Sequence, residues 1–390
     1  MNMSKTVLFV GGSHADIPQI NEVKKKGYKV ITTGNNKHDK GHKFADRTIL
    51  ADYSDYDQIL NLAEDLEVNA VCASANDFSQ LTSSYVAEKL QLPGFDSLIV
   101  NEIIHHKDKF KKFCLQNNFP IAKSYYESQI EKLVQSEFPI ITKPTDLTGG
   151  KGILVSNNIN ELKDSLEISR KMGKNKNIII EQYLNGSNHA MCSIIKNGKV
   201  IFYFFDNEHY YMNKFLVSGA SSSSIVPIEV QKKIIDEINR MCGILSLVDG
   251  IIHLQFILQK NNFFFLEICR RPPGDLYTRF VQLSTGKNLP LMIVNSYLGE
   301  KNNFSHEIKI EDNFILRHCL MANQSGKIKK ILYDDKIKKN IIEEIKFKVE
   351  NDVIENHLIE KASILFLKFE NKNEMSDKLS IIYELIKIEF

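Results

Sequence analysis

The sequence has almost no net charge and no long apolar segment. Its 50 basic and 48 acidic side chains give a formal charge of +2. Because binding to a phosphate backbone needs a basic excess on one face, this balance argues against a nucleic-acid partner. No apolar stretch reaches the length of a membrane helix, and the apolar run near the N-terminus is shorter than that of a signal peptide. We therefore expect a cytoplasmic protein that binds neither nucleic acid nor membranes.

Cysteine is scarce and does not occur in ligand-like pairs. No Cys-x-x-Cys motif and no Cys/His ligand spacing is present, so neither a structural zinc site nor a disulfide framework is indicated. We expect reduced, mostly buried thiols at the six positions: Cys72, Cys114, Cys192, Cys242, Cys269 and Cys319.

The length of 390 residues predicts two or three domains. In the first hundred residues, short apolar runs alternate with helical patterns, which is typical of right-handed crossovers in a doubly wound parallel sheet. The turn sequence Leu92-Pro93-Gly94 then predicts a boundary. We therefore expect an α/β, Rossmann-like domain over residues 1–100. Its predicted strands are 6–10, 29–32 and 70–73, and its predicted helices are 18–26, 57–66 and 82–90.

From residue 101 onward the pattern changes to α+β. A helix over 107–116 leads into pairs of short strands, which indicates antiparallel pairing. We expect a second domain over 101–300, including a subdomain at about 120–190, and a C-terminal α+β segment over 301–390. The C-terminal segment is expected to contain a strand at 364–369 and a final helix over 376–386.

A lysine at the end of a strand precedes a glycine-rich loop. Lys143 follows three apolar or β-branched residues, and Gly149, Gly150, Lys151 and Gly152 come shortly after it. Backbone N–H groups in such a loop can close on a phosphate, and lysine adds a movable point charge. The loop is not a Walker motif, because Gly-Lys-Ser/Thr is absent. The alternative interpretation is a flexible hairpin tip.

A second pattern places a carboxylate and two arginines at the end of an aromatic strand. Glu267 follows the run 263–266, and Arg270 and Arg271 come next. Carboxylate oxygens suit Mg²⁺, and an arginine beside them can neutralise a phosphoryl group. The strand 252–258 reads as the other half of a hairpin that turns at 260–262, which would place Gln255 beside Glu267. The alternative is a surface Glu–Arg ion pair, which is worth little.

A third pattern is a buried strand that runs into a polar segment. The isoleucines at 178–180 precede Glu181, Gln182, Tyr183 and Leu184. Adenine needs an apolar slot with backbone donor and acceptor groups, which the exit of such a strand can provide. On its own this pattern is weak, because many core strands end in the same way.

In this order the three patterns resemble the ATP-grasp superfamily, in the branch of carbamoyl phosphate synthetase, biotin carboxylase and amino-acid ligases. The resemblance extends over residues 5–300 closely and over the tail loosely. It implies a pre-ATP-grasp domain followed by two α+β subdomains that sandwich ATP. The residue roles that it implies are as follows: Lys107 and Lys143 as phosphate-binding lysines, Gly149 to Gly152 as the flap, Glu181 to Leu184 as the adenine hinge, His189 at the ribose, Gln255 and Glu267 as metal ligands, and Arg271 at the transferred phosphate.

Three positions depart from the family pattern. Gln255 replaces a glutamate, Cys269 replaces an asparagine that is normally a ligand of a second metal, and Asn188 replaces a residue that is often acidic. ATP with Mg²⁺ or Mn²⁺ is still implied, because Glu267 can bridge metals while phosphates and waters complete the shells. The number of metal ions stays open, and a non-catalytic nucleotide-binding protein is an alternative.

The resemblance implies that ATP phosphorylates a carboxylate and that an amine then attacks the acyl phosphate, with Lys143 and Arg271 as catalytic groups. Arg270, Arg271, Gly274 and Asp275 are expected to line the acceptor pocket, which suits a zwitterion such as an amino acid. Alternatively, one arginine pairs with Asp275 in a structural role.

Other members of the family use formate, bicarbonate or phosphoribosylamine, and these substrates stay open as alternatives. The expected partners are small-molecule carboxylates and amines, and the resemblance is also compatible with a homodimer. The serine-rich segment 218–224 is either a substrate-facing loop or a linker. His253 is either a phosphate contact or a core histidine.

Overall fold

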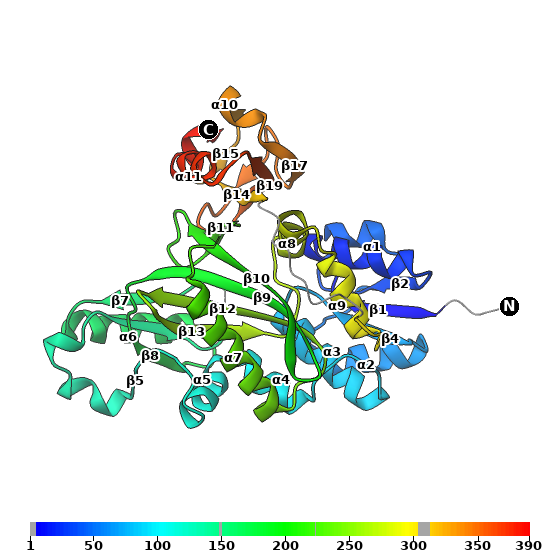
Figure 1. The fold of residues 1–390 in the computed structure, drawn as a ribbon, viewed down its shortest axis with the longest axis horizontal. Coiled ribbons are helices and arrows are strands. Elements are labelled where there is room, and N and C mark those ends of the chain that lie inside the picture. Colours follow the sequence, from blue (N-terminus) through cyan, green and yellow to red (C-terminus); the bar gives the residue numbers. More distant parts are fainter. Residues whose placement is uncertain (1–4, 148–149, 223, 303–312) are drawn as a thin grey trace.

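The computed structural model describes residues 5–147, 150–222, 224–302 and 313–390. The N-terminal unit is a parallel sheet in the order β3-β2-β1-β4, with helices packed around it (Figure 1). This confirms the Rossmann-like α/β prediction. Its strands are β1 (Thr6–Val10), β2 (Lys29–Thr32), β3 (Arg47–Thr48) and β4 (Ala70–Ala73), and its helices are α1 (Ile17–Lys25), α2 (Tyr56–Asp65) and α3 (Asp77–Leu90).

Two helices connect this unit to a small antiparallel sheet in the order β5-β8-β6-β7, covered by α6. We call this sheet and its helix the flap subdomain. The connecting helices are α4 (Leu98–His105) and α5 (Lys107–Gln116). The flap subdomain contains β5 (Ser124–Tyr125), β6 (Ile140–Pro144), β7 (Leu154–Ser156), α6 (Ile159–Met172) and β8 (Ile178–Gln182).

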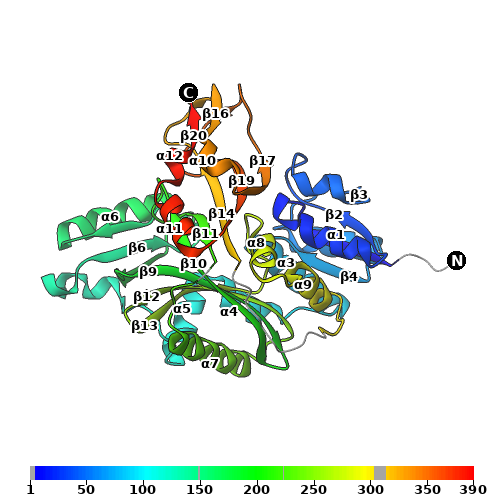
Figure 2. The ribbon, with the colours of Figure 1, turned by 45° about the horizontal axis from the view of Figure 1, so that its top comes forward.

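A sheet in the order β13-β12-β9-β10-β11-β14-β19-β17 forms the centre of the molecule, and α7 packs on one of its faces (Figures 1 and 2). Its β12–β13 hairpin turns between Gln259 and Asn262, as predicted. The elements are β9 (Ser187–Lys196), β10 (Lys199–Tyr210), β11 (Val217–Ser221), α7 (Ile228–Leu245), β12 (Gly250–Gln259), β13 (Asn262–Cys269), β14 (Phe314–Met321), β17 (Ile341–Lys346) and β19 (Lys361–Phe369).

Helices α8 (Tyr277–Thr285) and α9 (Leu289–Tyr297) lie between the N-terminal sheet and the central sheet (Figure 2). Phe9 of β1, Phe280 of α8 and Met292 of α9 belong to one hydrophobic core with Phe204 of β10. These apolar contacts fix the N-terminal unit against the central sheet. The predicted division at residues 100 and 300 stays a prediction.

The C-terminal segment adds β14, β17 and β19 to the central sheet and encloses a smaller core. The predicted final helix over 376–386 is confirmed only in part, because it is interrupted at Ile381 and ends before Ile386. A helix ends at Ser380, a second short one ends at Leu385, and Ile386 and Ile388 then pair with β16, which buries Ile386. The apolar spacing at 381–388 fits a helix and a strand equally well. The remaining elements are β15 (Gly326–Lys327), β16 (Lys330–Tyr333), α10 (Asp335–Lys338), β18 (Val353–Ile354), α11 (Lys372–Ser380), α12 (Ile382–Leu385), β20 (Ile386–Glu389) and the 3-10 helices His14–Asp16, Lys40–Phe44, Glu127–Lys132 and Gln135–Glu137.

Other predictions are confirmed with small shifts. Helix α3 begins five residues before its predicted start, because the Asn76 side chain accepts from the backbone N–H groups of Phe78 and Ser79. All six cysteines are free and buried. Within the described ranges, no helix combines the length and apolarity that crossing a bilayer requires.

Candidate active site

Two lysines from different elements share one electrostatic environment. Lys107 is the first residue of α5, and its ammonium donates to the carbonyl of Leu147 in the loop after β6. Lys143 lies on β6. Burial lowers the pKa of Lys107, the Glu267 carboxylate opposes that shift, and Lys143 adds to it. Lys107, Lys143 and Glu267, which are far apart in sequence, therefore lie within electrostatic range of one another.

Glu181 fixes the position of Lys143. Its buried carboxylate accepts from Lys143 at 2.8 Å and also from Lys111. Burial alone would raise the pKa of Glu181, but Lys143 and Lys111 outweigh it and lower the pKa to about 2. Sequence reasoning missed Lys111, although its position four residues after Lys107 places both lysines on one face of α5.

At two positions of the glycine-rich loop the backbone has a conformation that only glycine adopts readily. Gly150 and Gly152 have φ values of +74° and +71°. A Cβ on Gly150 would lie 2.7 Å from the Cβ of Phe215, and one on Gly152 would lie 2.7 Å from the Cγ of Pro144. Lys151 is exposed between them, and Gly149 lies outside the described residues. The loop thus approaches the segment between β10 and β11.

The predicted adenine hinge, Glu181 to Leu184, comprises the last two residues of β8 and the two residues after it. Gln182 is exposed, Tyr183 donates its backbone N–H to the carbonyl of Pro139, and Leu184 is buried. His189, predicted at the ribose, is buried, and its ring stacks on Phe256. Both of its ring nitrogens have partners inside the protein, Ser187 Oγ at 2.7 Å and the Asp206 carbonyl at 3.1 Å. A ribose contact by His189 would require it to exchange one of these partners.

The predicted metal pair lies side by side. Gln255 on β12 is directly opposite Glu267 on β13, and Glu267 is exposed. Within the described part of the chain, no basic group lies within ion-pair distance of Glu267, and no group of three or more His, Cys, Asp or Glu residues is arranged to hold a metal. Magnesium at nucleotide sites takes one or two protein carboxylates with phosphate and water oxygens, so these residues fit Mg²⁺.

Cys269 does not fit a hard metal ion. Its thiol is buried and donates weakly to the carbonyl of Arg271 at 3.6 Å. Burial raises the pKa of the Cys269 thiol to about 11, so it stays protonated at neutral pH. Neutral sulfur is a poor ligand for Mg²⁺, which prefers oxygen.

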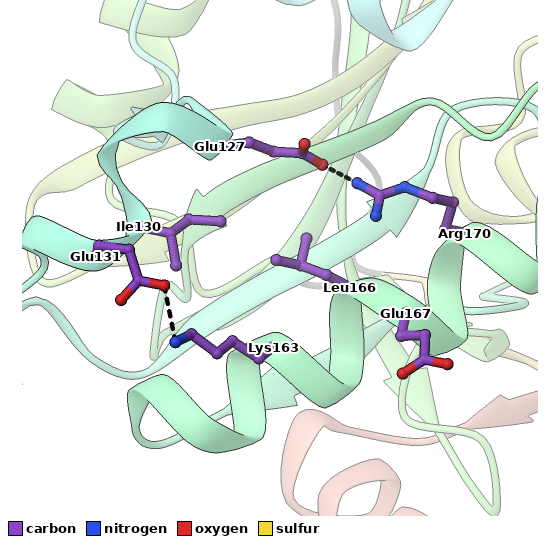
Figure 3. A pocket seen from close by; sticks show the side chains of 7 residues that line it. All are labelled: Glu127, Ile130, Glu131, Lys163, Leu166, Glu167 and Arg170. Atoms are coloured by element: carbon purple, nitrogen blue, oxygen red, sulfur yellow. Dashed lines mark hydrogen bonds and ion pairs between the residues drawn. The ribbon is translucent and has the colours of Figure 1, made fainter.

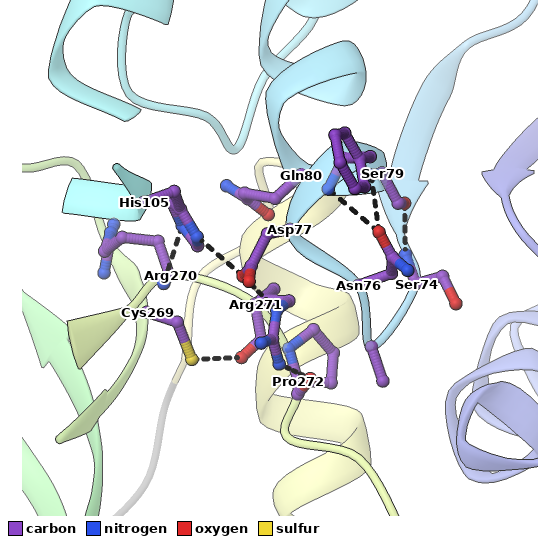
Figure 4. Close-up of polar contacts among 12 residues, drawn as sticks. Ser74, Asn76, Asp77, Ser79, Gln80, His105, Cys269, Arg270, Arg271 and Pro272 are labelled. Atoms are coloured by element: carbon purple, nitrogen blue, oxygen red, sulfur yellow. Dashed lines mark hydrogen bonds and ion pairs between the residues drawn. The ribbon is translucent and has the colours of Figure 1, made fainter. Parts of the chain in front are cut away.

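Arg271 is held by the N-terminal unit, a contact that sequence reasoning missed (Figure 4). Its Nε–H donates to Asp77 at 2.7 Å, and the same carboxylate oxygen lies 2.9 Å from Nδ1 of His105. The other nitrogen of His105 accepts the backbone N–H of Arg270, so the proton is on Nδ1 and points to Asp77. Arg271 and His105 keep the pKa of Asp77 well below its usual range, although burial acts to raise it.

The structure places Arg270 away from the predicted acceptor pocket. Its side chain is buried, donates to Asp96 at 2.7 Å, and also donates to the carbonyls of Ile251 and Val248 at 2.6 Å each. Its Nε and both terminal nitrogens therefore have partners inside the protein. Arg270 and Arg271 follow the end of β13, and their side chains bind different carboxylates, Asp96 and Asp77.

Asp275 pairs with neither Arg270 nor Arg271. The alternative in which one of these arginines pairs with Asp275 is therefore wrong. The Asp275 carboxylate binds Lys361 of β19 and lies 3.7 Å from Arg317 of β14. Asp275 and Leu276 both have left-handed φ values, +53° and +56°, which are costly for residues other than glycine. The C-terminal segment thus holds the loop after β13 in a strained conformation. In that loop, Gly274 has open space beside it.

The other two open assignments are partly resolved. Residues 217–221 form strand β11, which contradicts a linker, and Ser221 lies 2.8 Å from His209, whereas Ser223 lies outside the described residues. His253 is buried with its ring against Tyr277, and its Nε2 has no partner within the described ranges. The hydroxyl of Tyr277 also donates to the carboxylate of Asp206. Burial and the neighbouring Glu208 raise the pKa of Asp206 to about 8.

A pocket of about 260 Å³ lies elsewhere, on the outer side of the flap subdomain (Figure 3). Four of its charged groups form the pairs Glu127–Arg170 and Glu131–Lys163, and Glu167 pairs with Lys171 outside the pocket. It contains none of the predicted site residues.

Comparison with known proteins identifies the domain that carries these residues. The ATP-grasp domain family matches residues 105–275. The C-terminal section of the carbamoyl phosphate synthase large chain from Aquifex aeolicus is 25% identical over 166 residues, which cover 42% of this chain and 30% of that relative. The chain therefore spans less than a third of the length of this curated relative.

Solved structures match the fold along the whole chain. Phosphoribosylglycinamide synthetase from Anaerococcus prevotii has a TM-score of 0.80 and 21% identity, and L-amino acid ligase from Bacillus licheniformis has 0.81 and 18%, each with full coverage of both chains. A biotin carboxylase–βγ-ATP complex from Campylobacter jejuni has a TM-score of 0.77 and 16% identity, covering 99% of this chain and 92% of that one. Residues 105–275 therefore form an ATP-grasp domain, and the sequence similarity to the carbamoyl phosphate synthase large chain is consistent with that branch of the superfamily.

Proposed function

We propose that this protein is an ATP-dependent carboxylate–amine ligase that acts on an amino acid. The observation that carries the proposal is that electrostatic interactions link Lys107 to Lys143 and Glu267, and Glu267 to Arg271. These residues come from three separate segments, α5, β6 and the end of β13. In the proposed reaction a carboxylate oxygen attacks the γ-phosphorus of ATP and ADP leaves. The amine nitrogen then attacks the acyl carbon, phosphate leaves, and the nitrogen loses a proton.

The basic residues neutralise and position the transferred group. Lys107 and Lys143 approach from α5 and β6, and Glu181 holds Lys143 in place with a buried ion pair. Phosphoryl transfer depends mainly on such positioning and on charge stabilisation. The glycine-rich loop lies against Phe215 and, in the closed state, would shield the acyl phosphate from water.

Glu267 and Gln255 would hold Mg²⁺ or Mn²⁺, which neutralises charge on the phosphate oxygens when bound. Protonated Cys269 supports one protein-held metal ion in preference to two. Gln182 to Leu184 would form the adenine slot, in which the buried Leu184 supplies an apolar wall.

The acceptor pocket lies beside Arg271. Its Nε is used by Asp77 and its Nη1 donates to the Pro272 carbonyl, whereas the described residues provide no hydrogen-bond partner for Nη2. This edge of the guanidinium would bind the acyl phosphate or the substrate carboxylate. Gly274 leaves room beside it, and Arg270 is no longer part of the proposed pocket.

The test is incubation of the pure protein with Mg-ATP and pools of amino acids and small acids, with mass detection of products. We expect ADP release that depends on an acid and an amine, together with a product equal to their sum minus water. AMP formation would contradict the acyl-phosphate mechanism. Nucleotide binding without turnover in every pool would favour a non-catalytic protein, and turnover with formate, bicarbonate or phosphoribosylamine would redirect the substrate assignment.

A homodimer is also proposed, and sedimentation would test it.

A further inference from the structure

The β12–β13 hairpin offers one carboxylate and one amide side chain to a metal ion. Gln255 stands opposite Glu267 and is neutral. The affinity of oxygen-ligand sites for divalent cations depends on the number of charged ligands. A site built from Glu267 and Gln255 alone would therefore hold the metal–nucleotide complex more weakly than a site with two carboxylates.

Strand β10 brings another carboxylate to the same face of the sheet. Gln255 is opposite Ala190 on β9, and Ala190 is opposite Asp206 on β10. Residues that lie opposite one another in neighbouring strands point to the same face, and so do residues two apart along a strand. Glu208, two residues after Asp206, therefore shares the face of Gln255 and Glu267.

The small side chain between them allows Gln255 and Glu208 to meet. Strands β12 and β10 flank β9, so they are about 10 Å apart, two strand spacings. A long side chain at position 190 would fill that gap, whereas Ala190 leaves it open. Across it the Gln255 amide donates to one oxygen of Glu208, and the Tyr210 hydroxyl donates to the other at 2.8 Å.

Glu208 is held by neutral donors, unlike other carboxylates around the cleft. Glu181 is paired with Lys111 and Lys143, and Asp275 with Lys361. For Glu208, the described residues supply no basic group within ion-pair distance, and its charged neighbours include Glu267 and, farther away than an ion pair, Arg317. Two like charges beside each other in a partly buried site are unfavourable unless a cation binds between or near them.

We propose that Glu208 supplies the second carboxylate of the metal site and takes over the charge that Gln255 lacks. The metal–nucleotide complex would then be held by Glu208 and Glu267, with Gln255 fixing Glu208 through its amide. This inference rests on the proposed function, because the metal is expected to bind together with the nucleotide.

The test measures Mn²⁺ binding to the full chain in the presence of ADP, from the loss of the electron paramagnetic resonance signal of hydrated Mn²⁺. In the Glu208→Gln variant the amide oxygen can still accept a hydrogen bond, so the charge changes more than the packing. We expect the Mn²⁺ dissociation constant to rise about 10-fold or more. Adding Gln255→Glu to this variant restores the carboxylate count and should return the constant to within about threefold of the parent value.

Two controls make the result specific. Glu229→Gln, at an exposed position of α7, should leave Mn²⁺ binding unchanged, and Glu267→Gln should weaken it.

The inference would be overturned if Mn²⁺ binding were unchanged in Glu208→Gln but weakened in Glu267→Gln. If Glu208→Gln does not fold, Glu208→Asp should weaken Mn²⁺ binding to a smaller extent, and an unchanged constant there would equally overturn it. ADP binding to the parent protein in excess Mg²⁺ separates the two proposals, because a parent protein that does not bind ADP under these conditions contradicts the proposed function itself.

Discussion

At the scale of single residues, neighbours in sequence have different tasks. Arg270 and Arg271 are adjacent, yet Arg270 is buried in an ion pair with Asp96, whereas Arg271 is partly exposed and pairs with Asp77 of α3. The same contrast separates Gln255, which points into the site, from its buried neighbours on β12. Alternation of side chains along a strand accounts for the second case, whereas Arg270 and Arg271 lie beyond the end of β13.

Replacing the two arginines by methionine should therefore give opposite results. Arg270→Met leaves the buried Asp96 carboxylate without its ion-pair partner, and we expect a loss of about 3–5 kcal/mol in the free energy of unfolding. Arg271→Met should retain most of its stability but lose ligase turnover by about 100-fold, which corresponds to about 2.7 kcal/mol. Denaturant unfolding and ADP release, measured on both variants, check this pair. Equal effects of the two changes on both quantities would contradict it.

At the scale of elements, the site is assembled from an N-terminal helix, a flap strand and a central hairpin. The sequence predicts the parts that local rules determine. A short turn at residues 260–261 forces Gln255 beside Glu267, and glycine spacing indicates the loop at 150–152. Asp77, Arg317 and Lys361 could not be predicted, because their contacts with residues 271–275 join segments more than forty residues apart without a local pattern.

The glycine-rich loop gives a test at this scale. In Gly152→Ala the left-handed φ of +71° and the 2.7 Å approach to Pro144 force the loop to move, and we expect ATP turnover to fall about 10-fold. Gly243→Ala is the matched control: it lies in α7 with nothing near its Cβ, and should raise stability by about 0.5–1 kcal/mol without affecting turnover. Normal ATP kinetics in Gly152→Ala would show that the loop does not act on the nucleotide.

The link between α3 and Arg271 gives a second test. Asp77→Asn removes the charge that orients Arg271, so we expect the KM for the carboxylate substrate to rise about 10-fold while the KM for ATP stays nearly constant. Asp57→Asn, on the exposed surface of α2, is the control and should change neither constant. A rise in the KM for ATP alone would place Arg271 at the nucleotide and not at the acceptor.

At the scale of the whole molecule, buried titratable groups link stability to pH. His209, His253 and His318 have pKa values of about 4, 3 and 3, lowered first by burial from 6.5. The unfolded chain therefore binds three more protons than the folded chain at these sites between about pH 4 and 6.5. The carboxyl group of Asp206, whose pKa is raised to about 8, binds one more proton in the folded state than in the unfolded state. The net difference at these four groups is therefore two protons (three minus one).

Stability should therefore fall as the pH decreases through this window. We expect the Tm to be lower at pH 4.5 than at pH 7, and His318→Gln to reduce the difference, because it removes one of the protons that only the unfolded chain binds. Thermal unfolding followed by circular dichroism at the two pH values checks this. A Tm that is unchanged, or higher at pH 4.5, would contradict the assignment of these histidines as neutral.

The most direct test of the central claim is trapping of the acyl phosphate with hydroxylamine in place of the amine. With Mg-ATP and pools of amino acids as carboxylate donors, the ligase assignment predicts ADP release that depends on an acid, together with a hydroxamate of that acid. Both should be lost in Glu267→Gln, which removes a proposed metal ligand. Release of AMP and pyrophosphate, or no hydroxamate with any acid, would contradict the account.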